Sequence, residues 1–248
     1  MNSNANLILN FKNLFLLIMS IYCAINLESY AQTPGVNKWF VDKNSAGQNN
    51  GTSWENAWTS FSNINWNLIQ PGSTVYVSGG NDSTVYNETL TVGKSGVVGN
   101  LITITKGLSS GHNGRVIIDG GLSASSISIP GKSYVKVSNF ETVRGYSGVL
   151  IQAPINTIYL DSLIIKDYLD QAGINGNCWV CGANFGGDSL IVSNCVISNS
   201  DLLTQNDNSY FFKINYLLVE GCTFVNNNLI TSNENDYSDN IQCQAVGN

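Results

Sequence analysis

The sequence predicts an all-β solenoid, in which the chain winds into stacked coils of short strands, and three observations support this prediction. One pattern of strand, two-residue turn and strand is written twice, as LIVSNCVISN at 190–199 and LLVEGCTFVN at 217–226. Fainter copies stand upstream at 135–143 and 158–166, so the turn returns every 23 to 32 residues. The sequence is also short of helix formers and rich in turn residues, and repeats of this length then indicate stacked β coils.

Alignment of the copies on the turn indicates which side chains point into the solenoid. The second turn residue is Asn139, Ser162, Asn194 or Gly221, and Asn and Gly accept a left-handed backbone most cheaply. Apolar residues recur two and four positions before this residue and one and three positions after it, and a period of two gives each strand one apolar face. The column two positions before the turn residue contains Val137, Leu160, Val192 and Val219.

Each coil is expected to hold a third strand before its turn-centred pair, which makes three sheets. Longer loops enter some coils, and all of them are expected at one corner of the solenoid, where such folds usually carry a binding surface. The third strands are expected at 127–129, 149–152, 179–181, 211–214 and 241–244, and the longer loops at 145–148, 167–177, 201–210 and 229–240.

The composition favours one large β domain and argues against a nucleic-acid binder. The 248 residues are enough to bury a sizeable core, since 43% of them are hydrophobic and 10% are aromatic. Only 11% are charged, and the formal net charge is −6, with no basic run. A nucleic-acid binder needs a basic face, so this class of partner is disfavoured.

Residues 1–31 are predicted to be a secretory signal peptide. Lys12 gives a positive start, 14–25 form the apolar core, and the small-x-small sequence at 29–31 fits cleavage. A membrane anchor is the alternative, but the apolar run is short for a bilayer span, and no later segment has the length and apolarity to cross a membrane. The mature protein is therefore expected to be secreted, extracellular or periplasmic, with no membrane partner after cleavage. Its oligomeric state stays open.

Five cysteines remain after that cleavage, and two of them are expected to stack in the core. Cys195 and Cys222 stand one position after the turn residue in neighbouring coils, so they form either a buried stack of small apolar side chains or a disulfide. Cys178 and Cys181 have the spacing of a redox motif, but they lie in a β repeat without the strand–helix context of that motif. A redox or zinc role is therefore disfavoured, and the pairing of all five, Cys243 included, stays open.

The segment 32–73 is expected to form an N-terminal cap that contains an amphipathic helix. Thr52 and Glu55 make a capping-box pattern, and Pro71-Gly72 would end the helix before a strand at 74–77. The expected apolar stripe of this helix is Ala57, Trp58, Phe61, Ile64, Leu68 and Ile69.

This segment resembles the N-terminal part of the right-handed parallel β-helix proteins of the pectate-lyase-like superfamily. In that family an extended segment and an amphipathic helix precede a PGDTV strand. Here 71–75 reads PGSTV, with Ser73 in place of the usual acid. The pieces at 89–92, 101–104 and 115–121 are also similar to the family.

The resemblance covers about residues 39–248. It implies a right-handed parallel β-helix of three sheets over 74–248, with the helix shielding the open end from edge-to-edge pairing. No closing helix or polar rung precedes Asn248, so the β-helix is expected to be truncated at its C-terminal end or covered there by a partner.

The resemblance also implies where chemistry would take place, because that family usually binds substrate along the outer face of the first parallel sheet. Lys213 is the only basic residue on the strands assigned to this sheet, and its neighbours Phe212 and Ile214 should point inward. The acids of the adjoining loops offer the hard oxygen ligands that calcium prefers. The candidate calcium ligands are Asp207, Glu234, Asp236 and Asp239, and the candidate substrate-binding residues are Arg144, Gln152, Trp179, Phe211, Gln242 and Gln244.

This set fits calcium-assisted β-elimination on an acidic polysaccharide, and the sharpest prediction is a secreted polysaccharide lyase. With the uronate carboxylate neutralised by calcium, the proton beside it becomes more acidic, and a lysine of lowered pKa would remove it. Lys213 is the candidate base, by its location alone. The alternative is a solvated lysine among solvated acidic loops, which corresponds to a non-catalytic carbohydrate-binding or adhesion module on the cell surface.

Several other side chains have two interpretations each. Arg144 either reaches a substrate carboxylate or pairs with a nearby acid such as Glu141. Trp179 and Phe211 either stack on sugar rings or fill the core, and strand alternation favours an outward Phe211. His112, the only histidine, is expected to be an exposed loop residue rather than a base. A hydrolase would need paired carboxylates on the binding face, and none stands on the predicted strands.

Overall fold

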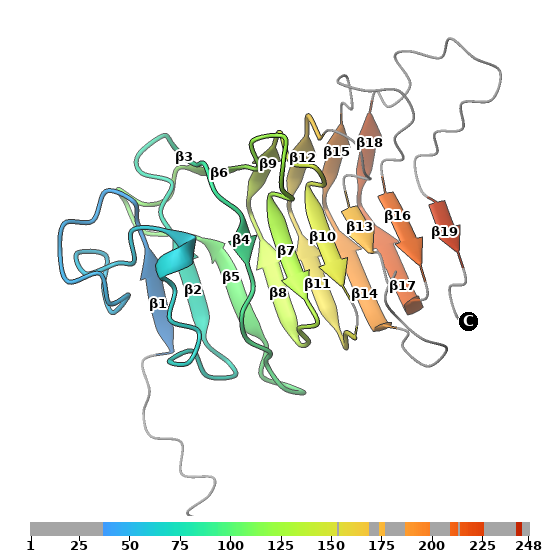
Figure 1. Cartoon of the computed structure of the whole chain (residues 1–248), viewed down its shortest axis with the longest axis horizontal. Helices are drawn as coiled ribbons and strands as arrows, with labels where there is room; N and C mark the ends of the chain where they lie inside the picture. The colour runs from blue at the N-terminus through green and yellow to red at the C-terminus, as the bar shows by residue number, and fades with distance from the viewer. Residues whose placement is uncertain are drawn as a thin grey trace, which may run out of the picture. The chain divides into compact units, whose positions relative to one another are not determined.

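The chain forms a parallel β-helix of three sheets. The computed structural model describes residues 37–152, 154–168, 174–176, 187–198, 209–212, 214–225 and 242–244. Over these ranges the chain passes through the three sheets in turn, and each strand pairs with its counterparts one coil before and one coil after (Figure 1). Every pairing between named strands is parallel, which confirms the stacked coils that the repeats predicted.

The sheets are named A, B and C in the order in which each coil enters them. Sheet A contains β1 (Lys38–Val41), β2 (Thr74–Val77), β5 (Ile102–Lys106), β8 (Val135–Ser138), β11 (Ile158–Asp161), β14 (Gly187–Ser193) and β17 (Ile214–Glu220). Sheet B contains β3 (Ser83–Tyr86), β6 (Arg115–Asp119), β9 (Glu141–Val143), β12 (Ile164–Lys166), β15 (Val196–Ser198) and β18 (Thr223–Val225). Sheet C contains β4 (Leu90–Thr91), β7 (Ile127–Pro130), β10 (Val149–Gln152), β13 (Ile174–Gly176), β16 (Ser209–Phe212) and β19 (Gln242–Gln244).

The predicted third strands correspond to sheet C, with two differences. β10 covers the predicted 149–152, but the strand expected at 179–181 lies outside the described residues, and the sheet C strand of that coil is β13. The strand expected over 211–214 is divided, because β16 ends at Phe212 and Ile214 already begins β17 in sheet A. β3 has no counterpart among the predicted strands.

The turn between sheets A and B has the left-handed residue that the alignment predicted. The φ angles are +63° at Asn139, +55° at Ser162, +55° at Asn194 and +63° at Gly221. In three of these turns the backbone amide donates to the next coil, as from Ser162 to the Ser193 carbonyl at 2.9 Å. Asn and Gly therefore recur because each coil needs one positive φ at the same place in the stack.

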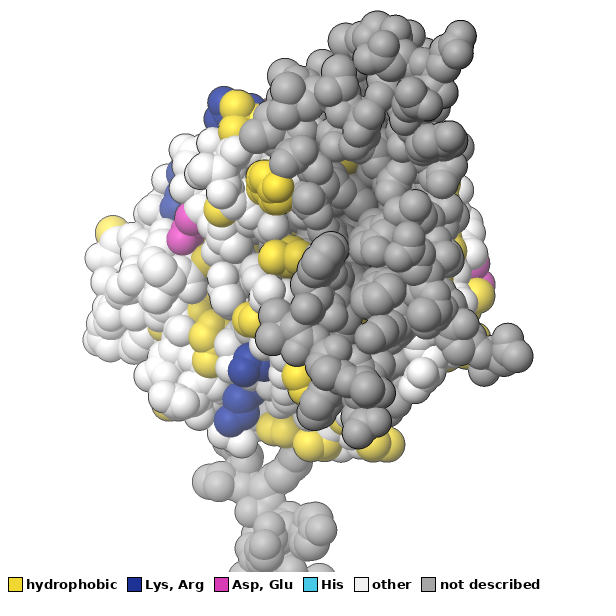
Figure 2. Space-filling model, turned by 45° about the vertical axis from the view of Figure 1, so that its right-hand side comes forward, with side chains coloured by type: hydrophobic (Ala, Val, Ile, Leu, Met, Phe, Trp, Pro, Cys, Tyr) yellow, Lys and Arg dark blue, Asp and Glu magenta, His cyan; other side chains and the backbone are white. Residues whose placement is uncertain are grey.

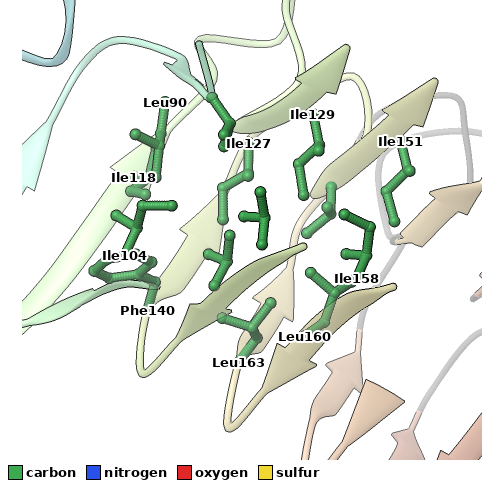
Figure 3. Packing of buried hydrophobic residues seen from close by; sticks show 14 of the residues in the cluster. Leu90, Ile104, Ile118, Ile127, Ile129, Phe140, Ile151, Ile158, Leu160 and Leu163 are labelled. Carbon is green, nitrogen blue, oxygen red and sulfur yellow. The ribbon is translucent and has the colours of Figure 1, made fainter. Parts of the chain in front are cut away.

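The core is a set of apolar columns that run from coil to coil. Val137, Leu160 and Val192 are in register on β8, β11 and β14, and all three are buried, as the period of two predicted. Figure 3 shows Leu160 and similar side chains projecting from the strands into the shared interior. The labelled members are Leu90, Ile104, Ile118, Ile127, Ile129, Phe140, Ile151, Ile158, Leu160 and Leu163.

The expected amphipathic helix in the cap does not form. Between 52 and 73 the structure has one short 3-10 turn, η1 (Phe61–Asn63), and otherwise irregular backbone. The Asn65 side chain accepts the Asn67 amide at 3.2 Å, a local bond that competes with helical hydrogen bonding. The apolar stripe is nevertheless buried except at Leu68, so its spacing is satisfied by a chain that wraps without a helix.

This irregular segment still covers part of the exposed edge of sheet A. The Trp58 amide donates to the Phe40 carbonyl at 2.9 Å, and the Asp42 amide donates to the Trp58 carbonyl at 2.8 Å. The Trp58 ring stacks on Trp39 with centroids 5.3 Å apart. β1 thus has a partner on its outer side where an uncovered edge would attract another chain. Among the described residues no helix is long and apolar enough to cross a membrane.

Candidate functional site

A polar cleft opens at the corner between sheets B and C, where three successive coils meet. It encloses about 460 Å³, which is within the range of small-molecule sites. The ends of β3, β6 and β9 reach this corner side by side, and it is the corner at which the longer loops were expected. The cleft is lined by Asn87, Glu88, Thr89, Asp119, Gly120, Gly121, Ser123, Ala124 and Arg144.

An ion pair between Asp119 and Arg144 dominates the cleft. Arg144 Nε lies 3.1 Å from each carboxylate oxygen of Asp119, and Arg144 Nη2 makes a closer contact with Oδ2. The Gly121 amide also donates to Asp119 Oδ1 at 3.0 Å. The side chain of Asp119 is 7% exposed whereas that of Arg144 is 56% exposed. The buried carboxylate therefore holds a guanidinium whose remaining N–H groups are open to a ligand.

The contacts of this pair keep both groups charged. Burial alone would raise the pKa of the Asp119 carboxyl, but the hydrogen bonds from Arg144 and the Gly121 amide outweigh it and hold the pKa below its ordinary value. The hydrogen bond to Asp119 in turn raises the pKa of Arg144. Asp119 is thus a positioning residue and a poor proton donor.

The backbone beside the pair is strained. Arg144 and Leu122 have φ angles of +47° and +65°, which are uncommon for residues other than glycine. The Leu122 amide donates to the Arg144 carbonyl at 2.6 Å, so the two conformations support each other. A Cβ on Gly120 would lie 2.4 Å from the Ala124 carbonyl oxygen, so the lining there is bare backbone. Strained residues of this kind often accompany binding sites.

Glu88 places a second carboxylate in the cleft. Its Oε1 accepts the Phe61 amide at 3.0 Å, and its Oε2 accepts the Ser62 amide at 3.4 Å, so the cap segment orients the side chain. The two carboxylates and one guanidinium leave the cleft with a net charge of −1. Its donors and acceptors thus suit a ligand rich in hydroxyl groups, since a hydroxyl can both donate and accept.

Among the predicted site residues that the structure describes, Arg144 alone lines this cleft. Arg144 pairs with a nearby acid, which was one of its two interpretations, but this acid is Asp119. Glu141, the example considered, lies 3.2 Å from Arg115 and 2.5 Å from Lys166. Gln152 is exposed at the far end of β10, where it pairs with Pro130 of β7.

The remaining predicted residues are described only in part or not at all. Gln242 and Gln244 of β19 are in register with Tyr210 and Phe212 of β16. Phe211 of β16 is in register with Gly176 of β13 and with Cys243 of β19. The candidate base Lys213, the aromatic Trp179 and the candidate calcium ligands Asp207, Glu234, Asp236 and Asp239 lie outside the described residues.

His112 is more enclosed than an exposed loop residue. Its Nδ1 lies 3.2 Å from Asp42 Oδ2 and 2.9 Å from Ser78 Oγ, and its ring stacks on Trp54 at 3.9 Å. Both polar contacts involve the same nitrogen, whereas a Ser–His–Asp relay requires one partner on each ring nitrogen. The cluster therefore ties β1, β2 and the cap segment together rather than forming a catalytic triad.

Sequence reasoning missed Asp119 and Glu88. Asp119 had a usable signal, since it follows an apolar strand and precedes two glycines, which is where a strand end meets a loop. Glu88 had none, because its place depends on a three-residue corner and on contact with a distant segment. In the described ranges no three His, Cys, Asp or Glu side chains are close enough to hold a metal ion.

On the face that Figure 2 shows, most described side chains are uncharged or hydrophobic, with Lys and Arg in small separate groups. This agrees with the charged content of 11%. Such a surface would select a ligand by hydrogen bonds and shape rather than by long-range charge.

No protein-family model and no curated protein matches the chain. Among solved structures it is similar to a GH136 lacto-N-biosidase from Eubacterium ramulus, with a TM-score of 0.46 and 17% identity over 91% of this chain and 43% of that one. The native form of that enzyme gives a TM-score of 0.44 and 14% identity, with 84% and 40% covered. Pectate lyase Pel9A gives a TM-score of 0.30 and 14% identity, with 80% of each chain covered.

The chain thus spans less than half the length of the lacto-N-biosidase it resembles. On the pairing of its own strands, the chain is a parallel β-helix protein.

Proposed function

We propose that this protein binds polysaccharide at the corner cleft between sheets B and C. The observation that best supports this proposal is the half-exposed guanidinium of Arg144, which the buried Asp119 holds in place. A fixed guanidinium offers donors to sugar oxygens, and the Glu88 carboxylate beside it offers acceptors to sugar hydroxyls. Because these groups are oriented before a ligand arrives, binding loses little side-chain entropy.

The cleft suits sugars more than other small molecules. Backbone at Gly120 and the small side chains of Ser123 and Ala124 let a ring approach closely, and the volume of about 460 Å³ admits a short oligosaccharide. A planar apolar cofactor would need aliphatic or aromatic walls, which the cleft lacks. The predicted secretion signal at 1–31 would bring the protein to extracellular glycans.

The sharper form of the proposal is a calcium-assisted lyase that acts on acidic polysaccharide. Lys213, in its neutral form, would take the proton beside the uronate carboxylate, and the bond to the leaving sugar oxygen would break as a carbon–carbon double bond forms. The leaving oxygen would take up a proton from water to become a hydroxyl group. Asp207, Glu234, Asp236 and Asp239 would hold the calcium, and Gln152, Trp179, Phe211, Gln242 and Gln244 would position the sugar chain. This form rests on the predicted location of these residues.

The alternative is a carbohydrate-binding or adhesion module without catalysis. The cleft fits this alternative, because the hydrogen bonds from Arg144 and the Gly121 amide hold the pKa of Asp119 below its ordinary value and make it a poor acid catalyst. An assay separates the lyase from the binding module: the protein is incubated with pectate, alginate or chondroitin, with and without calcium, and the ultraviolet absorbance of unsaturated products is measured. Growth of the signal with calcium and its loss in Lys213→Ala would support the lyase. Binding on a glycan array without any product would support the module.

The binding proposal is tested by Arg144→Gln, with Arg115→Gln as the matched control. Both arginines are more than half exposed and paired with a buried carboxylate, but Arg115 does not line the cleft. Loss of a charged hydrogen-bond donor should weaken oligosaccharide binding by about 10-fold or more. Titration calorimetry with the best glycan from the array should show this for Arg144→Gln and less than about 2-fold for Arg115→Gln. Equal effects of the two variants would place the site elsewhere.

A further inference from the structure

Cys195 and Cys222 are free thiols that stand one coil apart at the same turn. The register of β14 with β17 and of β15 with β18 continues across this turn, so the two residues are direct neighbours in the stack. The preceding residues, Asn194 and Gly221, are both left-handed, so the two turns have the same backbone shape. Neighbouring strands lie about 4.8 Å apart, which is within the Cα separation of about 4.4–6.8 Å that a disulfide requires.

The two side chains point the same way. Cys195 Sγ lies 3.2 Å from the Ser193 carbonyl oxygen, and Cys222 Sγ lies 3.4 Å from the Glu220 carbonyl oxygen. Each contact is to the carbonyl two residues earlier, so the thiols occupy equivalent places in successive coils. Rotation of one side chain toward the other would bring the sulfurs together.

The two thiols differ in their access to solvent. Cys195 is fully buried, and burial raises the pKa of its thiol to about 12. Cys222 is half-buried, and the residues on either side of it, Gly221 and Thr223, are exposed. Because the thiolate is the reactive form and must reach its target, Cys222 is the thiol that a reagent in solution meets first.

We propose that Cys195 and Cys222 form a reversible redox pair, which closes to a disulfide with a small-molecule disulfide of the glutathione class as oxidant. The Cys222 thiolate attacks the external disulfide, which gives a mixed disulfide and releases one external thiol. Cys195 then loses its proton and attacks the Cys222 sulfur, so the second external thiol leaves. Two protein thiols are thereby oxidised, and one external disulfide is reduced to two thiols.

The bridge would fasten two coils to each other across the turn between sheets A and B. It would close a loop of the chain from 195 to 222 and so restrict the unfolded state. Because a solenoid is held together mainly by contacts between neighbouring coils, one such link stabilises the coils it joins. This inference does not depend on polysaccharide binding.

The test uses the full chain in glutathione buffers of increasing oxidised fraction. Free thiols are alkylated, and peptides are mapped without reduction by mass spectrometry. We expect a cross-linked peptide pair that contains Cys195 and Cys222, and a rise in Tm on the order of 10 °C as it accumulates, which is what one restrained loop of this length gives in a domain of this size. Full alkylation of both residues at the most oxidising ratio, or their pairing with Cys178, Cys181 or Cys243, would overturn the proposal.

Cys222→Ser is the deciding variant, because the half-buried site tolerates a hydroxyl. Its Tm should be the same in oxidising and reducing buffer, whereas Cys243→Ser, the matched control, should keep the shift of the unaltered protein. Cys195→Ala should also lose the difference in Tm between the two buffers. If Cys195→Ala does not fold, because the residue is buried, the result for Cys222→Ser decides. A shift that persists in Cys222→Ser would refute the assignment.

Discussion

Asp119, which is buried, and Asp161, which is half-buried, show what a carboxylate needs when it is partly removed from solvent in this solenoid. Asp161 accepts hydrogen bonds from Ser193 and Asn194 at 2.9 and 3.1 Å and lies 3.0 Å from Lys136. In both acids burial would raise the pKa, but the surrounding donors outweigh it and lower the pKa. A lowered folded-state pKa means that the stabilisation is present above the unfolded value, about 3.9, and is lost as the pH falls through the folded value.

The protein should therefore lose stability on acidification, and Asp119 should be one cause. Urea unfolding measured from pH 7 down to pH 2 should show a falling free energy of unfolding below about pH 4. Asp119→Asn should be less stable at pH 7 and should have a shallower slope in the acid range, because its amide does not titrate. An unchanged slope would mean that Asp119 does not link stability to pH.

Ser162 is the least suitable residue in the column of left-handed turns. Asn139 and Asn194 use their amides to donate to Thr105 Oγ1 and Asp161 Oδ1 of the preceding coil, each at 3.1 Å. Ser138 of the preceding coil stands in the same position relative to Ser162, so its hydroxyl oxygen is the corresponding acceptor. Ser162→Asn should stabilise the fold by about 0.5–1 kcal/mol, since Asn tolerates positive φ and gains this bond. Urea unfolding measures the change, and a loss of stability in Ser162→Asn but not in Ser162→Ala would contradict it.

At the scale of the strand, alternation decides the cost of a substitution. Ile164 and Ile165 are neighbours on β12, yet Ile164 is 42% exposed and Ile165 is fully buried. Ile165→Ala should cost about 2–5 kcal/mol, because it removes core contacts and leaves a cavity. Ile164→Ala should cost less than about 1 kcal/mol. Similar losses for the two variants, measured by urea unfolding, would show that β12 does not present its residues to opposite faces.

The same alternation explains how much could be predicted from sequence. Val137, Leu160 and Val192 could be placed in one column because strands repeat every two residues and the turn fixes their phase. The stripe from Ala57 to Ile69 was misread as a helix, because buried residues in an irregular wrap can imitate a period near four. Asp119, Arg144 and Glu88 meet only because three corner loops of unequal length end at one place, and no local pattern encodes that meeting.

At the scale of the whole molecule, each coil is stabilised mainly by its neighbours. In such a stack, local damage spreads only as far as the coupling between coils allows. The first coil is the informative place to test this, because β1 has a sheet partner on one side and the irregular cap segment on the other. Trp58 is the residue of that segment that pairs with β1 and packs on Trp39.

Trp58→Ala should therefore loosen the first coils and expose the edge of β1. Loss of a buried tryptophan costs about 3–5 kcal/mol locally, so hydrogen exchange should accelerate strongly in β1 and β2 and little in β8 and β11. An uncovered edge strand pairs with other chains, so sedimentation velocity should show self-association that grows with concentration. Leu68→Ala is the control, since this residue of the same segment is 46% exposed, and it should leave the protein in its original association state. Uniform acceleration of exchange through β11 would instead mean that the solenoid opens as one cooperative unit and that the cap stabilises all of it.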